Sequence, residues 1–452
     1  MTVASPFARR VMGVFATRVV RYAVGFVTSF VLARILGPAG RGVYYLVILT
    51  PTTLVALGQL GFPSAVSFFA GRGRSGKALQ RTSLILVAAL SAVLIGATLL
   101  ALPLLQGSLL KAAPEELVRL ALISLPFQFL ASFAGSALIG RQILRNYNLI
   151  LVAHSLLMLA LIVVFVGVLG LGVVGAVVAN VATAGAVAVA TTIELRRVVH
   201  RDPEEAERPG VRLSELASYG VKAYPASVAG FFNYRADVFL LSALLGDPQA
   251  IGLYSLAVSL AELTFFVPDS VATVFFPRVA GANRRTADEL APSVSRFTVL
   301  MTGLSVLGLV PAGFAAVYVV IPDFVASLPA FLIILPGILA LSVSKVLSSY
   351  ISGLGLPQRV AFVSSAALAI NLAANLLLIP PFGFHGAAAA SLISYSAHAA
   401  MLVVITSRLS HRPPRDYLVP TAAEWRRLRS GLHELRDRLR RSQPTPGPGA
   451  EG

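Results

Sequence analysis

The sequence contains no cysteine and little charge, and both absences narrow what the protein can be. Without cysteine it has no disulfide bonds, no thiolate metal ligands and no cysteine nucleophile. Charged residues make up 13% of the 452 residues, whereas an ordinary soluble protein carries about 25%. The mean hydropathy is +0.79. The composition therefore predicts a chain that lies mostly within a membrane.

Acidic residues are missing from the first part of the chain, where the first Asp or Glu is Glu115. The net charge is +17, which in a soluble protein would favour nucleic acid as a partner. Here most basic residues lie in the predicted loops and in the C-terminal tail. We therefore expect them to face the anionic inner leaflet, and we expect no nucleic acid partner.

Apolar stretches recur along the sequence, and each is long enough, at about 20 residues or more, to cross a bilayer as a helix. They predict an all-α polytopic membrane protein with about twelve transmembrane helices. The predicted spans are 11–36, 43–70, 79–105, 116–139, 149–169, 173–195, 215–245, 250–276, 294–320, 324–353, 359–379 and 386–407.

Lysine and arginine gather in every second loop between these spans. Basic clusters follow the second, fourth, sixth and eighth spans, and the intervening loops hold few basic residues. Cytoplasmic loops carry an excess of Lys and Arg in membrane proteins. This asymmetry predicts that both termini are cytoplasmic.

Two motifs recur at nearly the same spacing. Residues 36–44 (LGPAGRGVY) are similar to 245–254 (LGDPQAIGLY), and 172–176 (GVVGA) to 383–387 (GFHGA). Six spans per half, both halves starting on the same side, predict two lobes related by a parallel internal repeat, with a substrate site between them. The predicted divisions are a first lobe 1–197, a cytoplasmic linker 198–214, a second lobe 215–408 and a basic tail 409–452.

The same regions carry a family resemblance. The stretch 30–38 (FVLARILGP) with Gly42-Val43-Tyr44, and 233–237 (NYRAD) leading to Gly252-Leu253-Tyr254, resemble the polysaccharide flippase family of the multidrug, oligosaccharidyl-lipid and polysaccharide exporter superfamily. The resemblance implies alternating access and transport of an undecaprenyl-pyrophosphate-linked oligosaccharide to the outer leaflet. It implies a bacterial inner membrane protein for O-antigen, lipopolysaccharide or exopolysaccharide synthesis, with polymerase and chain-length machinery as partners. It implies neither catalytic residues nor a cofactor or metal.

Two arginines lie deep in the first span. Arg18 is about 10 Å and Arg21 about 15 Å from its start, at about 1.5 Å per residue. With Tyr22 they share one helical face. Cations at that depth face a protein interior or a wet cavity, and arginine donates bidentate hydrogen bonds to phosphate oxygens. We predict a pyrophosphate site here, with Lys222, Arg235 and Lys345 as second-lobe candidates. The alternative is that Arg18 extends to the inner interface.

Several ionisable residues of the spans are candidates for coupling transport to an ion gradient. They are Asp237, Glu262, Asp269, His154 and His398. Intramembrane acids also pair with arginines, and intramembrane histidines also form interhelical hydrogen bonds. A structural role therefore stays open for each of them. No nucleotide-binding motif is present, so the expected driving force is an ion gradient or the substrate gradient.

The tail has apolar residues at alternating steps of three and four, with arginines between them. This spacing predicts an amphipathic basic helix on anionic lipids, or a short coiled coil. The residues expected at the lipids include Trp425, Arg426, Arg427, Arg436 and Arg440.

Three other functions compete with the flippase. A multidrug or cation antiporter would favour acids in the first lobe, whose acids lie only at span ends. A membrane oligosaccharide polymerase or ligase needs a large outer loop, and the longest outer connection is 106–115. A non-transporting scaffold would leave the buried cations without a purpose.

Overall fold

The computed structural model of the chain describes residues 6–422, 424–426 and 429, without the side chains of 6–16, 18, 222, 223 and 226. The described residues form helices joined by turns and loops, without strands. In chain order the elements are α1 (Pro6–Gly58), α2 (Phe62–Gly71), α3 (Gly76–Gln106), α4 (Glu115–Leu122), α5 (Ser124–Gly140), α6 (Leu144–Ile162), η1 (Val163–Val168), α7 (Gly172–His200), α8 (Leu213–Leu245), α9 (Pro248–Glu262), η2 (Leu263–Phe265), α10 (Phe266–Ala280), α11 (Arg284–Val320), η3 (Pro322–Ser327), α12 (Leu328–Gly353), α13 (Pro357–Ser410) and α14 (Arg415–Leu418).

Among the described residues, ten helical stretches are long and apolar enough to cross a membrane. Two of them, α1 and α13, are broken in the middle. The breaks lie at Gly37, with φ 65° and ψ 179°, and at Gly383, with φ 58° and ψ −139°. The segments beside each break are long enough to span alone. The ten stretches thus supply the twelve spans that the sequence predicts.

Glycine makes the break in α1 possible, because a side chain at φ 65° would be strained. Pro38 then begins the next segment, where its missing N–H costs no hydrogen bond. The predicted second span, 43–70, is wrong at its end. That helix stops at Gly58, and a separate short helix, α2, follows. Gly61, with φ 74°, makes the turn between them.

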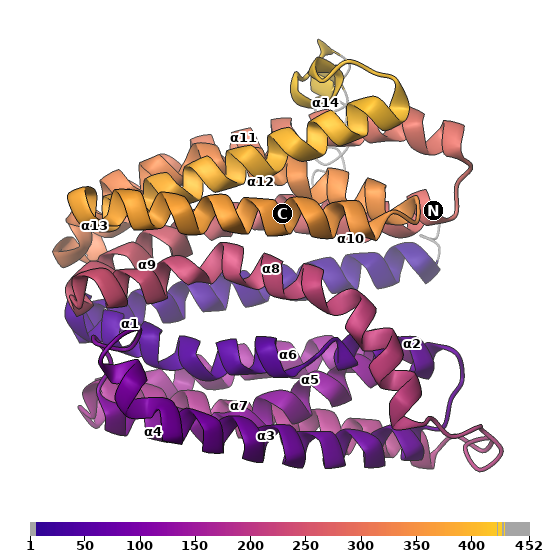
Figure 1. Cartoon of the computed structure of the whole chain (residues 1–452), viewed down its shortest axis with the longest axis horizontal. Helices are drawn as coiled ribbons and strands as arrows, with labels where there is room; N and C mark the ends of the chain where they lie inside the picture. The colour runs from indigo at the N-terminus through magenta and orange to yellow at the C-terminus, as the bar shows by residue number, and fades with distance from the viewer. Residues whose placement is uncertain (1–5, 423, 427–428, 430–452) are drawn as a thin grey trace, which may run out of the picture.

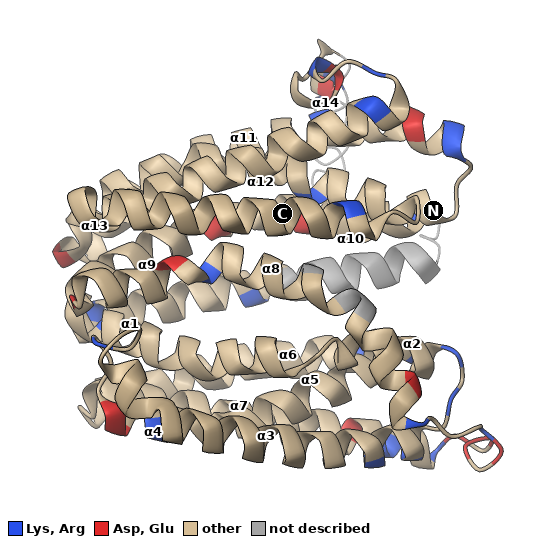
Figure 2. Ribbon diagram, in the orientation of Figure 1, with Lys and Arg blue, Asp and Glu red and all other residues tan. Residues whose placement is uncertain are grey.

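The helices run as long, roughly parallel rods (Figure 1). Figure 1 shows α3–α7 below and α10–α13 above, with α1, α8 and α9 between them. We call α1–α7 the first half and α8–α14 the second half. Most charged residues gather at the right-hand end of Figure 2, and the middle of the helices is largely uncharged. We call that end the Arg141 end and the opposite one, where α1 breaks, the Gly37 end.

The two halves meet tightly at the Gly37 end. A Cβ added to Gly42 would lie 1.8 Å from the carbonyl oxygen of Pro248, and one added to Gly252 would lie 1.8 Å from that of Pro38. The motif repeat pairs Pro38 with Pro248 and Gly42 with Gly252. Each half therefore presses its glycine against the other half's proline carbonyl, as a two-fold axis between the halves would produce. In lipid such close backbone packing holds helices together, since burying apolar side chains there gains little.

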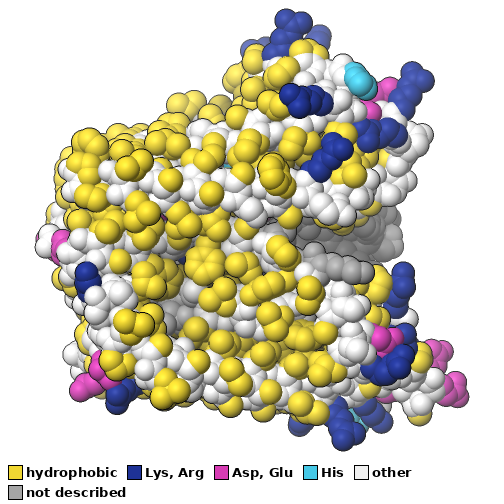
Figure 3. Space-filling view, viewed as in Figure 1, with side chains coloured by type: hydrophobic (Ala, Val, Ile, Leu, Met, Phe, Trp, Pro, Cys, Tyr) yellow, Lys and Arg dark blue, Asp and Glu magenta, His cyan; other side chains and the backbone are white. Residues whose placement is uncertain are grey.

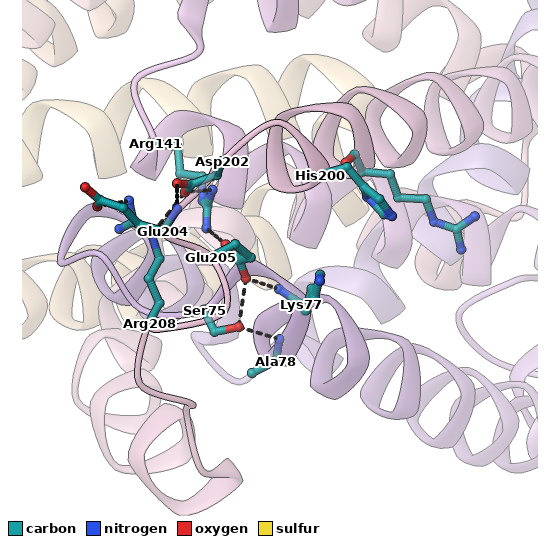
Figure 4. Close-up of polar contacts among 10 residues, drawn as sticks. Ser75, Lys77, Ala78, Arg141, His200, Asp202, Glu204, Glu205 and Arg208 are labelled. Atoms are coloured by element: carbon teal, nitrogen blue, oxygen red, sulfur yellow. Dashed lines mark hydrogen bonds and ion pairs between the residues drawn. The ribbon is translucent and has the colours of Figure 1, made fainter.

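The connection between the halves is fixed to the first half. Helix α7 continues to His200 and α8 begins at Leu213, so the linker is 201–212 rather than the predicted 198–214. Arg141 Nη2 lies 2.7 Å from Glu205 Oε2, and Arg141 Nη1 lies 3.2 Å from Asp202 Oδ2 (Figure 4). Glu205 is only 4% exposed and also accepts hydrogen bonds from the Ser75 hydroxyl and the Lys77 backbone N–H.

These contacts set the charge state of Glu205. Burial acts to raise the pKa of its carboxyl group. The hydrogen bonds from Lys77, Arg141 and Ser75 outweigh burial and leave the pKa below its ordinary value of 4.5. Glu205 is therefore ionised at neutral pH and binds the linker to α3 and α5.

Candidate functional site

Two adjoining chambers lie beside α1. The large chamber lies between the halves, has a volume of about 730 Å³ and is lined by Arg21, Tyr22 and Ser29 of α1 and by Glu262 and Asp269 of the second half. The small chamber has a volume of about 280 Å³ and is lined mostly by the first half. Ser29, Ser155 and Ser259 line both chambers, so the two lie side by side. Figure 3 shows the surface hollowed between the two halves. The position matches the predicted site between two lobes.

Aromatic rings and hydroxyl groups make up much of the large chamber. Phe26, Phe30 and Phe266 line it together with Ser155 and Ser259. The Tyr22 ring of the first half meets the Phe266 ring of the second half edge to face, with centroids 5.8 Å apart. Hydroxyl groups and ring faces are well suited to a polar, ring-shaped group such as a sugar.

Both acids of the large chamber are held by second-half cations. Glu262 accepts two hydrogen bonds from Arg235, at 2.9 and 3.2 Å. Asp269 contacts Lys345, whose ammonium group also lies 3.9 Å from the centre of the Phe265 ring. Arg21 adds a guanidinium group to a lining whose two acids are already paired with cations. The lining is therefore suited to an anion rather than to a cation.

Arg41 is a buried cation that the sequence analysis missed. It is 5% exposed and donates hydrogen bonds to the Ser29 carbonyl and hydroxyl, to Ser255 and to Ser259, at 2.7–3.2 Å. Within the described residues no carboxylate lies within 4.0 Å of it, so neutral oxygens stabilise its charge. Ser29 lies before the Gly37 break and Arg41 after it, while both other serines belong to α9. Arg41 thus fixes the bend of α1 and joins it to the second half.

Five of the predicted site residues line the chambers. Arg21, Tyr22, Glu262 and Asp269 line the large chamber, and His154 lines the small one. Arg235 and Lys345 bind the two lining acids. The possible pairing of Glu262 with an arginine of a neighbouring span is thus observed.

Two candidates lie away from the chambers, packed inside the second half. Asp237 is 2% exposed, and it accepts hydrogen bonds from the Tyr254 hydroxyl and from Ser391. Among the described side chains it forms no ion pair with Arg235, which binds Glu262 instead. His398 is also buried, with Nε2 3.3 Å from the Ser364 hydroxyl. Both positions favour a structural role.

Other predictions fall outside the described part of the chain. The side chains of Arg18 and Lys222 are not described, and neither are residues Arg427, Arg436 and Arg440 of the tail. Of the tail residues expected at lipid, Trp425 is 48% exposed and Arg426 is also exposed. The amphipathic helix stays a prediction.

The residues missed had weak signals in the sequence. Arg41 follows the Leu-Gly-Pro turn by three residues, a position typical of a loop. The break at Gly37 takes up a single residue and the next helix starts at once. Arg41 therefore lies within a membrane-spanning segment rather than in a loop. The chamber serine Ser155 resembles the other small residues of its helix. Its role depends on which face of α6 meets the chamber.

Comparison with known proteins shows which family this chain belongs to. The model of the family described as polysaccharide biosynthesis protein matches residues 8–283, more than half of the chain. The chain belongs to the polysaccharide biosynthesis protein family. The chain is 25% identical over 194 residues to the probable low-salt glycan biosynthesis flippase Agl15 of Haloferax volcanii. That match covers 41% of this chain and 40% of the relative, so the chain spans about two-fifths of the length of this curated relative.

Solved structures share the fold. The lipid II flippase MurJ in an inward closed conformation has a TM-score of 0.71 at 13% identity, with 89% of each chain covered. An inward-facing multidrug resistance MATE transporter of the MOP superfamily has a TM-score of 0.64 at 17% identity, covering 86% of this chain and 94% of that one. These similarities show that the chain shares the fold of these two proteins, and the ten apolar helices of its described residues support a multi-pass membrane protein.

Proposed function

We propose that this protein is a flippase, not an enzyme, that moves an anionic lipid-linked oligosaccharide across a bacterial inner membrane. The substrate would carry an undecaprenyl-pyrophosphate, and its path would be the two adjoining chambers. The guanidinium group of Arg21 in a chamber whose two acids are already paired carries this proposal. The family membership and the likeness to a flippase support it. The halves would act as lobes that open alternately to the two sides.

The orientation belongs to the same proposal. The Arg141 end would be cytoplasmic, because basic loops gather there. The Gly37 end would then face the periplasm. A short oligosaccharide would lie against the rings and hydroxyl groups of the large chamber, and its pyrophosphate near Arg21. O-antigen, lipopolysaccharide and exopolysaccharide synthesis are the processes that would use such a product. A polymerase and chain-length machinery would act on it next.

The decisive test is Arg21→Ala. Transport is measured in proteoliposomes with a fluorescent undecaprenyl-pyrophosphate disaccharide, whose exposure in the opposite leaflet is detected with a membrane-impermeant quencher. We expect Arg21→Ala to lower the rate at least about tenfold, since it removes a charge-assisted contact with the anion. Arg21→Lys should restore part of the rate, because an ammonium keeps the charge but loses the planar fork.

Arg359→Ala is the matched control, because Arg359 is exposed at the start of α13, outside both chambers. Its rate should equal that of the unchanged protein. Wild-type flux from Arg21→Ala at equal protein amount would contradict a phosphate path past Arg21. Uptake of a cationic dye in place of the lipid would favour the multidrug antiporter.

A further inference from the structure

Two basic side chains of the first half reach across the Gly37 end to the second half. The Arg34 Nη1 atom donates a hydrogen bond of 2.8 Å to the carbonyl oxygen of Val320, and Lys111 Nζ donates one of 2.8 Å to that of Ala243. Both side chains are exposed at this end of the bundle. Neither contact is an ion pair, so neither can be found by matching opposite charges in the sequence.

The acceptors are carbonyl groups at helix ends. Val320 is the last residue of α11, and Ala243 lies two residues before the end of α8. The last four carbonyl groups of a helix lack partners within the helix. The helix dipole also gives this end a partial negative charge, which favours a nearby cation. Arg34 and Lys111 therefore cap two second-half helices with charges from the first half.

The two contacts are reciprocal in the sense of the internal repeat. Arg34 lies at the end of the first predicted span and Val320 at the end of the third span of the other half. Ala243 lies at the end of that half's first span, and Lys111 follows the third span of the first half. In each contact, the end of the first span of one half meets the end of the third span of the other half. The repeat therefore makes the same contact twice, with the halves exchanged. The reciprocal Gly42 and Gly252 contacts lie at the same end.

We propose that Arg34 and Lys111 form a latch that keeps the chambers closed at the Gly37 end. The latch must open before the chambers can face that side, so the two residues set the balance between the two conformations. This rests on the proposed function, in which the halves open alternately. Exposed contacts of this kind are individually weak, because water competes for both partners. Weak contacts suit a closure that has to release in every transport cycle.

The chain has no cysteine of its own, so a single introduced cysteine reports on one position. Ala272 lines the large chamber, and Ala272→Cys is the reporter. Its labelling rate by a membrane-impermeant maleimide is measured in right-side-out and inside-out vesicles. No substrate is added. Total reactive cysteine after denaturation checks that each variant is present in equal amount.

We expect Arg34→Ala and Lys111→Ala each to raise labelling from the Gly37 side about threefold, and the double variant about tenfold, as two weak polar contacts would. Labelling from the Arg141 side should fall in parallel, because the two conformations exchange. A variant that merely unfolds would instead be labelled faster from both sides. Lys111→Arg keeps a donor and should resemble the unchanged protein.

Arg119→Ala is the control, since Arg119 lies near the same end on α4 but pairs with Glu115 of its own helix. It should leave both labelling rates unchanged. Equal rates in the double variant and the control would overturn the latch. The result is independent of the Arg21 flux measurement. Lost flux in Arg21→Ala with unchanged labelling in the latch variants would leave the flippase proposal intact and remove the latch alone.

Discussion

At the scale of single residues, the membrane region holds three different kinds of charge. Arg21 lines the chamber, Arg235 and Glu262 pair at its wall, and Arg41 is stabilised by neutral oxygens. The sequence predicted the charges of Arg21, Arg235 and Glu262, because each is an outlier in an apolar helix, but not the buried charge of Arg41. It could not predict which ones meet. That depends on the rotation of one helix against another, and several rotations bury similar apolar faces.

Arg235 and Asp237 show how the direction of a side chain on its helix decides whether a charged group reaches the chamber. Two residues apart on a helix, they point in nearly opposite directions. Arg235 reaches Glu262 at the chamber, and Asp237 packs against Tyr254 inside the second half. From the sequence alone, Arg235 was a candidate for the pyrophosphate and Asp237 a candidate for ion coupling.

We predict that Glu262→Gln removes the pH or sodium dependence of transport, because Glu262 is an ionisable acid at the chamber wall. Asp237→Asn should leave that dependence in place. It should instead lower stability by about 1–3 kcal/mol, since the new amide would face the Tyr254 hydroxyl with a donor. The measurements are flux against pH and sodium, and thermal unfolding in detergent. The reverse pattern would assign ion coupling to Asp237.

At the scale of helices, breaks and contacts between backbones decide the fold. The apolar stretches predicted twelve spans, and the glycines of the repeat motifs mark the turns. Gly37, Gly172, Gly246 and Gly383 all have positive φ, between 55° and 65°. What the sequence could not show is that Gly42 and Gly252 are contact points between the halves. A glycine within a helix carries no information about its neighbour until the helices are packed.

We predict that Gly42→Ala and Gly252→Ala lower the stability of the protein by at least about 2 kcal/mol, because each new methyl group would overlap a proline carbonyl of the other half. Gly308→Ala is the control. Nothing lies within 4 Å of a Cβ at Gly308 inside α11, so this change should be neutral or slightly stabilising. The midpoints of thermal unfolding of the three variants are measured in the same detergent and compared. Equal midpoints would contradict backbone contact at this end.

At the scale of the whole molecule, the boundary between the two parts that would move in the proposed transport cycle does not coincide with the linker. The linker is bound to the first half through Arg141, and Gly220 and Tyr224 of α8 contact α1 and the turn after it. The other end of α8 packs with the second half, where Asp237 bonds to Ser391 of α13. Relative motion of the halves would therefore bend α8 near Pro225, where a helix hydrogen bond is missing.

We predict that Glu205→Gln releases the linker from the first half. Tryptic cleavage at Arg201, Arg208 or Arg212 should become several-fold faster at neutral pH, because cleavage follows local opening. Glu204→Gln is the control, since Glu204 lies in the same loop with a side chain 76% exposed. Unchanged cleavage in Glu205→Gln would show that the linker is held by other contacts.

The unchanged protein and Glu205→Gln should also differ in how their stability depends on pH. Because the pKa of Glu205 is lowered by folding, its ionised form stabilises the protein above about pH 4.5, and this stability is lost as the pH falls through the lower folded-state value. The difference in melting temperature between the unchanged protein and Glu205→Gln should be constant from pH 8 to about pH 5.5 and shrink below pH 4.5. A constant difference at every pH would contradict the lowered pKa.

The reciprocal contacts at the Gly37 end also bear on the origin of the chain. An interface in which position i meets j and j meets i is the mark of two identical subunits around a two-fold axis. A six-helix ancestor of half the length, inserted in one orientation, would have paired with its own copy through these positions. In such a homodimer, one mutation at the equivalent of Gly42 would have altered both contacts at once. A duplication and fusion of such an ancestor would make Gly42 and Gly252 separate targets of selection, and would allow basic residues such as Arg34 and Lys111 to be kept on one side alone.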